Sequence, residues 1–150
     1  MASFAATVGN WANKVPRALE VVFKESAQEL VEQLQTLLTD MVYDQPVGPS
    51  GYLRTGFLRA SLVASTTAMP QMIRENPGVT LPPDLGEIVL VINGMDENDT
   101  LYLGYTANYA AYVHYGANGR PARPWITLVA QRWETIVTAK AAEVKRRLGL

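Results

Sequence analysis

The chain has 150 residues, of which 48% are hydrophobic and 18% are charged, and its formal net charge is −1. This length suits one domain with its own core, and the near-neutral charge gives no strong electrostatic attraction to nucleic acid. Without cysteine the chain can form neither disulfides nor thiolate metal sites, and its single histidine excludes a multi-histidine metal centre. No apolar run approaches the ~18 residues of a membrane span, and the first residues lack the basic start of a secretory signal. We therefore expect a soluble, intracellular protein with no membrane partner.

The first predicted element is an amphipathic helix over residues 17–42. Pro16 suits its first turn, because a backbone N–H there has no partner within the helix. Residues 44–51 hold two prolines and two glycines, which predicts a loop after the helix. The apolar residues recur at steps of three and four, which places them on one helical face; they are Leu19, Phe23, Ala27, Leu30, Leu34, Leu37 and Met41.

The segment after this loop predicts a short helical turn and then a strand. Residues 55–61 begin with Thr55, a favourable N-cap, and residues 62–67 are partly β-branched with loose alternation. Four prolines between residues 69 and 86 favour a long connection after the strand.

Two further strands are predicted in the middle of the chain. Residues 87–92 are almost continuously apolar, which is typical of a strand buried on both faces. Residues 100–105 form the other strand. Residues 93–99 would join the two as a hairpin loop of more than two residues.

The C-terminal part of the chain predicts two helices. A short one has Asn108 as its N-cap and runs through Val113, and Gly116 ends it. A long one covers residues 124–148, with Pro124 in its first turn. Its last turn carries three cations, where the helix dipole favours them: Lys145, Arg146 and Arg147. Its apolar face comprises Trp125, Leu128 or Val129, Trp133, Ile136 or Val137, Val144 and Leu148.

The order of these elements predicts a single α+β domain over residues 1–150. We expect an antiparallel sheet of about three to four strands, packed by a long N-terminal helix and a long C-terminal helix, with a short helix between them. Neither an internal repeat nor a shift in composition divides the chain.

His114 is the first candidate for chemistry, because the ordinary pKa of histidine lies near neutrality. A catalytic histidine needs an orienting partner and a nucleophile, and the nearest upstream carboxylates, Glu97 and Asp99, fall in the predicted hairpin loop. The Gly-x-Ser-x-Gly nucleophile motif is also absent. We therefore expect a partly exposed histidine beside a tyrosine cluster. A small hydrolase-like enzyme using His114 and a tyrosine is the alternative.

The tyrosines around His114 favour aromatic packing over base stacking. A stacking platform normally lies in a basic groove, and this segment has no lysine or arginine before Arg120. We expect the rings to pack at a helix–sheet junction, with their hydroxyls directed to water or to a partner subunit. These tyrosines are Tyr105, Tyr109, Tyr112 and Tyr115.

Three other patterns resemble known binding sites but lack the residues that would complete them. The acidic segment 96–99 lacks the glycine and the final glutamate of a calcium loop, so it predicts a solvated loop tip. The glycine-rich segment 48–56 lacks the Gly-Lys-Ser/Thr ending of a phosphate-binding loop. Four arginines would bind phosphate only if the fold brings them together, and each can instead pair with a carboxylate or a helix end: Arg54, Arg59, Arg120 and Arg123. We expect no catalytic residue, no metal site and no cofactor.

Three blocks of sequence occur in a characteristic order. The first is Thr55-Gly56-Phe57-Leu58-Arg59-Ala60-Ser61. The second is Tyr109-Ala110-Ala111-Tyr112-Val113-His114-Tyr115-Gly116. The third is Arg123-Pro124-Trp125 at the start of the last helix. Together they resemble the tail-completion, or head–tail joining, family of long-tailed bacteriophages. That family typically shows Thr-Gly-x-Leu-Arg-x-Ser, then Tyr-Ala-x-Tyr-Val-Glu-x-Gly-Thr, then Arg-Pro-Phe before a long last helix.

The resemblance spans residues 17–148 and has two departures that matter. His114 stands where the family usually has glutamate, and Ala117 stands where threonine usually follows Gly116. We expect His114 to serve contacts with neighbouring proteins, and Tyr109, Tyr112 and Val113 to share one helical face. The resemblance implies structural and interface roles for Thr55, Gly56, Leu58, Arg59, Tyr109, Ala110, Tyr112, Val113, His114, Gly116, Arg123 and Pro124.

The function that the resemblance implies is a structural one in the virion. Such a subunit forms a homo-oligomeric ring, expected to be a hexamer because tail tubes are commonly six-fold. The ring joins the tail tube to the head-proximal connector around the DNA channel, and its partners are the neighbouring neck proteins and the tail-tube protein. We expect the protein in the host cytoplasm during assembly and in the neck or proximal tail of the finished virion.

Two further expectations follow from this role. Contact with genomic DNA would be non-specific and within the channel, through a few lysine or arginine residues such as Arg74 on the long connection. A closely related role is that of a tail terminator, which caps the tail tube. A binding module for a host protein, acting through exposed aromatic residues, is a third class of function.

Overall fold

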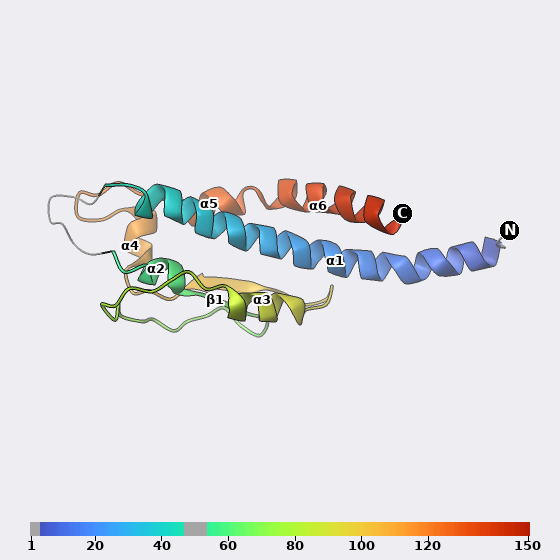
Figure 1. Ribbon diagram of the computed structural model, residues 1–150, viewed down its shortest axis with the longest axis horizontal. Helices are drawn as coiled ribbons and strands as arrows, with labels where there is room; N and C mark the ends of the chain where they lie inside the picture. Colours follow the sequence, from blue (N-terminus) through green and yellow to red (C-terminus); the bar gives the residue numbers. More distant parts are fainter. Residues whose placement is uncertain (1–3, 47–53) are drawn as a thin grey trace.

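The computed structural model describes the backbone of residues 4–46 and 54–150, and its elements form two layers along one long helix (Figure 1). Helix α1 (Phe4–Leu38) lies in one layer with α5 (Trp125–Ala130) and α6 (Trp133–Leu148). The other layer contains α2 (Phe57–Ala60), strands β1 (Leu62–Ser65) and β2 (Tyr102–Tyr105), and α3 (Gly86–Asn93). Helix α4 (Ala110–Tyr115) connects the layers at the end where the C-terminal half of α1 lies (Figure 1). The predicted α+β class, with a long helix at each end of the chain, is confirmed. No helix in the described part of the chain is long and apolar enough to cross a membrane.

Helix α1 buries a stripe with four- and three-residue steps, which lies between the two layers. Ala27, Val31, Leu34 and Leu38 form it, and Val42 extends it beyond the helix. Ala27 and Leu34 belong to the predicted apolar face, whereas Leu19 is exposed. The helix begins at Phe4 and not at residue 17, so the first-turn position expected for Pro16 is wrong. Most residues from 12 to 19 are exposed, so water can satisfy the carbonyl that lacks an N–H partner because of Pro16.

The last turn of the first helix is wider than an α-helical turn. Residues Thr39–Tyr43 form a π-helical turn, η1, and the N–H of Asp44 donates to the carbonyl of Thr39 at 2.8 Å. The Thr39 hydroxyl donates to the carbonyl of Gln35 at 2.8 Å, one turn earlier. This bond is of the kind that competes with regular helical bonding. Val42 stays buried after this turn, and Tyr43 reaches the next segment of the chain.

The sheet of the described residues consists of two antiparallel strands, fewer than the three to four expected. Leu62 of β1 pairs with Tyr105 of β2, and Ser65 pairs with Tyr102. Both strands lie where the sequence predicted them. The long connection over residues 69–86 is also confirmed, and it is tied to the end of β2 where the N–H of Arg74 donates to the carbonyl of Thr106 at 2.7 Å.

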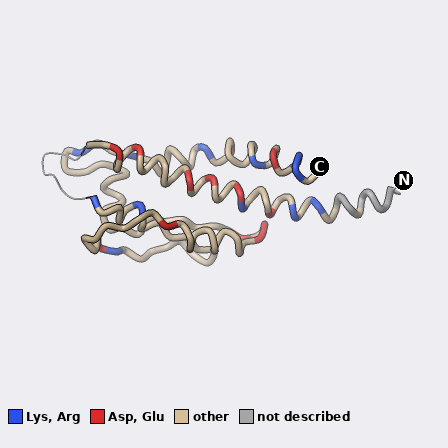
Figure 2. The backbone as a smooth tube through the Cα atoms, in the orientation of Figure 1, with Lys and Arg blue, Asp and Glu red and all other residues tan. Residues whose placement is uncertain are grey.

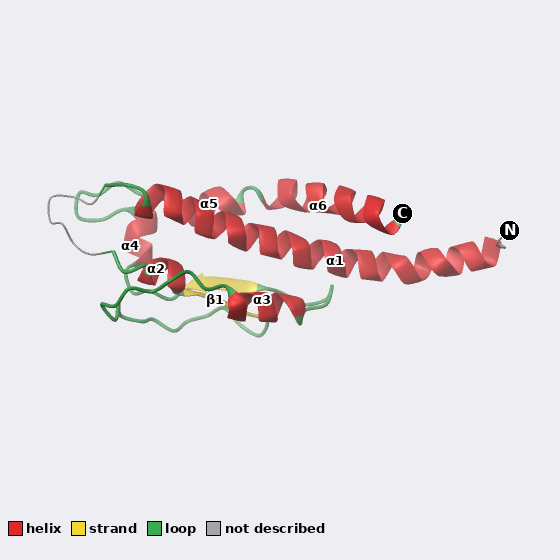
Figure 3. Ribbon diagram, in the orientation of Figure 1, coloured by secondary structure: helices red, strands yellow, loops and turns green. Residues whose placement is uncertain are grey.

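The expected strand over residues 87–92 is wrong, because this segment is helix α3 (Figure 3). Ile88 and Ile92, one helical turn apart, are buried in the core, whereas Leu90 between them is 72% exposed. A short apolar run has no polar positions to distinguish a period of two residues from a period of 3.6. Residues 93–99 consequently join a helix to a strand and do not form a hairpin loop.

The expected C-terminal helix is divided into α5 and α6 by a turn at Gln131 and Arg132. Trp125, Val129 and Ile136 are buried. In an uninterrupted helix these three would still fall within about 40° of one another, at 3.6 residues per turn, so their periodicity does not reveal the break. The predicted cations do occupy the last turn of α6.

Replacing Ile92 and Leu90 in separate variants tests whether this segment is a helix. Ile92→Ala removes a fully buried side chain, so the free energy of unfolding should fall by about 2–5 kcal/mol. Leu90→Ala should change it by less than about 0.5 kcal/mol, because Leu90 is exposed. Urea denaturation measures both. Equal losses would contradict the helix, since residues 88, 90 and 92 share one face of a strand.

Candidate functional site

The three sequence blocks meet around one pocket at the α2–α4 end of the molecule. The pocket has a volume of about 550 Å³. We call it the corner pocket. Its described lining residues come from the end of the first helix, the start of α2, α4 and the loop after α4; they are Val42, Tyr43, Arg54, Thr55, Gly56, Leu58, Asn76, Tyr109, Tyr112, Val113, Ala117, Asn118, Arg120 and Arg123.

The first wall is the turn at Thr55 and Gly56. The Thr55 hydroxyl donates to Asn76 Oδ1 at 3.2 Å and accepts the N–H of Phe57 at 3.3 Å. Thr55 therefore accepts the first N–H of α2, as expected. The N-cap residue itself is Gly56, however, so Thr55 lies one residue before the N-cap. Leu58 is buried in the core beneath the turn.

Gly56 also allows the long connection to cross the turn closely. Its φ is +82°, and a Cβ at this position would lie 2.6 Å from the carbonyl oxygen of Leu81. The N–H of Leu81 donates to the carbonyl of Thr55 at 2.7 Å. Glycine is therefore needed here both for its backbone conformation and for the space it leaves.

Arg59 fixes α2 against the end of the first helix. Its backbone N–H donates to the Tyr43 hydroxyl at 3.2 Å, and its guanidinium carbon lies 4.5 Å from the centre of the Tyr43 ring. The guanidinium also donates to the Thr39 hydroxyl at 3.0 Å. These contacts span the two layers and involve the π-helical turn directly.

The second wall is the face of α4 that carries Tyr109, Tyr112 and Val113. All three line the corner pocket, as the expectation of a shared face requires. Tyr109 also packs against the Phe57 ring, with centroids 6.3 Å apart, while Tyr112 is largely exposed. Ala110, on another side of α4, is buried in the core. Asn108, the expected cap of this helix, is exposed and makes no capping bond, because Tyr109 is the residue before the first turn.

His114 lies on the opposite side of α4 and is only 5% exposed, so the expected partial exposure is wrong. Its ring meets Trp125 and Tyr115 edge-on, with centroids 5.5 Å and 4.5 Å away. Nε2 accepts the N–H of Thr127 at 3.3 Å and lies 3.2 Å from its hydroxyl. The proton of the neutral ring therefore sits on Nδ1, which is buried without a partner. With the side chain covered in this way, His114 presents little surface to a neighbouring protein.

Burial lowers the pKa of His114 below its ordinary value of 6.5. Protonation would also place a second N–H on Nε2, opposite the N–H of Thr127. No carboxylate in the described part of the chain forms an ion pair with the ring. A catalytic histidine needs a carboxylate to orient it, and none is among the described partners of His114.

Gly116 and Arg123 turn the chain from α4 into α5. Gly116 has φ +84° and ψ 148°, and a Cβ there would lie 2.9 Å from both the N of Ala122 and the O of Arg120. The N–H of Arg123 donates to the carbonyl of Val113 at 3.0 Å, which closes the loop. Pro124 precedes the first turn of α5 and so leads Trp125 into the core, where it is fully buried.

Three of the four arginines considered for phosphate binding line the corner pocket: Arg54, Arg120 and Arg123. Arg54 donates to carbonyls that follow the first helix, those of Tyr43 at 3.1 Å, Pro46 at 3.3 Å and Gln45. Arg59 lies outside the lining, and Arg74 is held by the Thr106 hydroxyl at 2.9 Å and by the Phe57 ring. Arg74 is half-buried, and these contacts hold its side chain against the fold.

Sequence reasoning missed four residues of the corner pocket: Val42, Tyr43, Asn76 and Asn118. Asn118 has φ +54° and directly precedes Gly119, and an Asn-Gly pair is a sequence signal of a tight turn. Tyr43 and Asn76 reach the site through tertiary packing, which no local pattern reports.

The described residues contain no group of three or more histidine, aspartate or glutamate side chains that could hold a metal ion. The comparisons do not add an assignment. No protein-family model, no curated protein and no solved structure matches this chain. The site must therefore be interpreted from its own residues.

Gly116 and Gly119 form a matched pair for testing the corner. Both have positive φ, but a Cβ at Gly119 would meet no atom within 4 Å. Gly119→Ala should cost only the backbone strain of about 1–2 kcal/mol. Gly116→Ala should cost clearly more, because backbone atoms must also move. Thermal unfolding of the two variants measures the difference, and equal costs would show that the corner is not tightly closed.

Protonation of His114 should destabilise the fold. Its pKa in the folded chain lies below that in the unfolded chain, so the unfolded state binds more protons between the two values. The stabilising effect of the neutral ring is complete above pH 6.5 and is lost as the pH falls toward the lowered pKa. Urea denaturation between about pH 7.5 and pH 5, a range that spans the ordinary pKa of histidine, should show this loss in the native chain. The loss should be smaller in His114→Gln, and an equal loss in both would assign the pH dependence to other groups.

Proposed function

We propose that this protein is a structural subunit of a long-tailed bacteriophage virion, in a ring that joins the tail tube to the head-proximal connector around the DNA channel. The observation that carries the proposal is the convergence of the three blocks at the corner pocket. Thr55 and Gly56, Tyr109 and Tyr112, and Arg123 are far apart in the sequence but line the same pocket. Seven of the twelve residues to which the resemblance gives a role therefore line one pocket; they are Thr55, Gly56, Leu58, Tyr109, Tyr112, Val113 and Arg123.

The exposed apolar residues also support an assembled state. Met72 and Ile73 are adjacent in the long connection and largely exposed, and Leu90 and Tyr115 are exposed on α3 and α4. Isolated exposed apolar residues are common on monomers, but consecutive ones on a chain with 18% charged residues favour coverage by partner proteins. The partners in the proposed role are further copies of the chain, neck proteins and the tail-tube protein.

The surroundings of His114 favour a structural role over hydrolysis. The ring is buried against Trp125 and hydrogen-bonds to Thr127, and no carboxylate among the described residues forms an ion pair with it. A histidine that assists a nucleophile must exchange protons with a substrate. This ring instead supports the packing of α4 on α5.

A stop codon early in the gene, in the phage that encodes it, tests the proposed role. Electron microscopy of the lysate should show filled heads and tails of normal length that remain unjoined, and the infectious titre should recover when the native gene is supplied on a plasmid. Tails of excess length would favour the terminator role, because an uncapped tube continues to polymerise. A normal titre, with the protein absent from purified particles, would contradict both roles.

Supplying His114→Gln in the same complementation assay separates structure from chemistry. The proposed structural role predicts that head–tail joining is retained in proportion to the amount of folded protein. A hydrolase that uses His114 would lose its effect even when the variant folds and assembles. Circular dichroism of the purified variant supplies the control for folding.

A further inference from the structure

The corner pocket has charged side chains of only one sign among its described lining residues. Arg54, Arg120 and Arg123 contribute guanidinium groups, and the described lining includes no aspartate or glutamate. The Nε of Arg123 is buried and has no hydrogen-bond partner. A pocket with this composition is complementary to an anionic group that comes from outside it.

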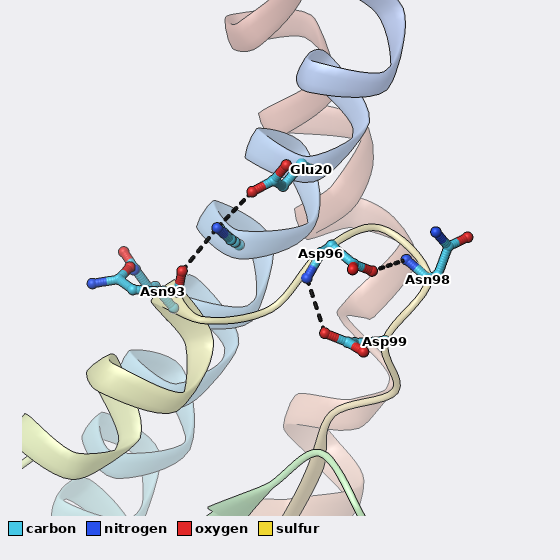
Figure 4. A network of polar contacts seen from close by, with 7 residues as sticks. Glu20, Asn93, Asp96, Asn98 and Asp99 are labelled. Atoms are coloured by element: carbon cyan, nitrogen blue, oxygen red, sulfur yellow. Dashed lines mark hydrogen bonds and ion pairs between the residues drawn. The ribbon is translucent and has the colours of Figure 1, made fainter.

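Three carboxylates lie close together in the loop between α3 and β2. Asp96, Glu97 and Asp99 are all exposed, and none of them forms an ion pair within the described chain. We call this segment, Asp96–Asp99, the acidic loop. Asp96 Oδ1 accepts the N–H of Asn98 at 2.8 Å, and Asp99 Oδ2 accepts the N–H of Asp96 at 3.0 Å (Figure 4). These bonds stabilise a turn at the tip of the loop.

Helix α1 fixes the base of the acidic loop. Lys24 Nζ donates to the carbonyl of Asn93 at 2.9 Å and also pairs with Glu20 at 2.7 Å (Figure 4). The side-chain amide of Gln28 donates to Asn93 Oδ1 at 3.2 Å. The loop is thus presented from a rigid element, which lowers the entropic cost of docking it.

A subunit cannot place its own acidic loop in its own corner pocket. The loop is anchored beside Lys24, and the pocket is lined by Val42. At 1.5 Å per residue these positions are roughly 25 Å apart along the helix. Figure 2 shows the acidic residues after α3 at one end of the sheet layer, and α2 with basic positions in and beside it at the other end. Only a different molecule can bring the two together.

We propose that the acidic loop of one subunit docks in the corner pocket of the next copy of this chain. The two surfaces differ, so the contact is head-to-tail, and its repetition generates a closed ring or an open filament. The inference rests on the proposed ring-forming role, for which it identifies the contact between neighbouring subunits. Exposed Tyr112 at the pocket mouth supplies an aromatic surface for the docked loop.

Disulfide trapping tests the contact without background, because the native chain has no cysteine. Glu97→Cys is mixed with Asn118→Cys, which places one thiol on the acidic loop and the other at the pocket. Glu97→Cys mixed with Glu134→Cys, an exposed position on α6, is the matched control. Under mild oxidation the first pair should form the heterodimer about tenfold faster than the control, equivalent to about 1.4 kcal/mol of preference. Equal rates would overturn the proposal.

Charge reversal provides a second, independent test. One variant carries Asp96→Lys, Glu97→Lys and Asp99→Lys, and the other carries Arg120→Glu and Arg123→Glu. Each alone should lose self-association in sedimentation velocity at low salt, and an equimolar mixture should regain it, because each altered surface then meets an opposite charge. Circular dichroism checks the folding of both variants. Failure of two folded variants to recover on mixing would overturn the contact.

The outcomes also separate this contact from the proposed function. Joined heads and tails together with no enriched cross-link would leave the function standing and remove the contact. If the cross-link is enriched but heads and tails join normally when the protein is absent, the contact stands and the proposed function is removed. Binding of a ten-nucleotide single-stranded DNA at the pocket, without cross-linking between copies, would overturn the contact in favour of nucleic acid.

Discussion

The burial of one stripe of α1 is the interaction on which the other elements depend. Ala27, Val31, Leu34 and Leu38 contribute to two clusters, one with Trp125 and Val129 and the other with α3 and the start of β1. The two-stranded sheet is too small to form a stable unit alone, and α5 is too short to persist in isolation. Both gain their stability from α1, so a rotation of α1 about its axis, which would move its buried stripe, would affect both layers together.

The sequence identified the elements whose side chains follow a clear period. Helix α1 was predictable from its helical period, which identified Ala27 and Leu34 of the buried stripe but not Val31, Leu38 or Val42. Strands β1 and β2 were predictable from their strand-forming residues, and the cations at the end of α6 from the helix dipole. Helix α3 was not, since its isoleucines, valines and leucine favour a strand by composition and hide the helical period. Its helical state is decided by packing: Ile88 and Ile92 enter the space beside α1, and a strand would have buried Leu90 as well.

The candidate site was only partly accessible to sequence reasoning, for a related reason. Glycines and turn residues mark local backbone geometry, so Gly56, Gly116 and Thr55 were identified correctly as structural positions. The exposure of a side chain depends on what packs over it, so His114 was misjudged. Tyr43 and Asn76 reach the corner pocket from other parts of the chain, and only the tertiary structure shows that they belong to it.

The shape of the corner pocket is set by contacts of backbone with backbone. At Gly56 the turn approaches the carbonyl of Leu81, and at Gly116 it approaches the backbone of Arg120 and Ala122. Exposed side chains such as that of Tyr112 line the pocket but are not part of this backbone frame. Evolution can therefore exchange them at little cost to folding, and a descendant of this protein could acquire a different partner while keeping the same scaffold.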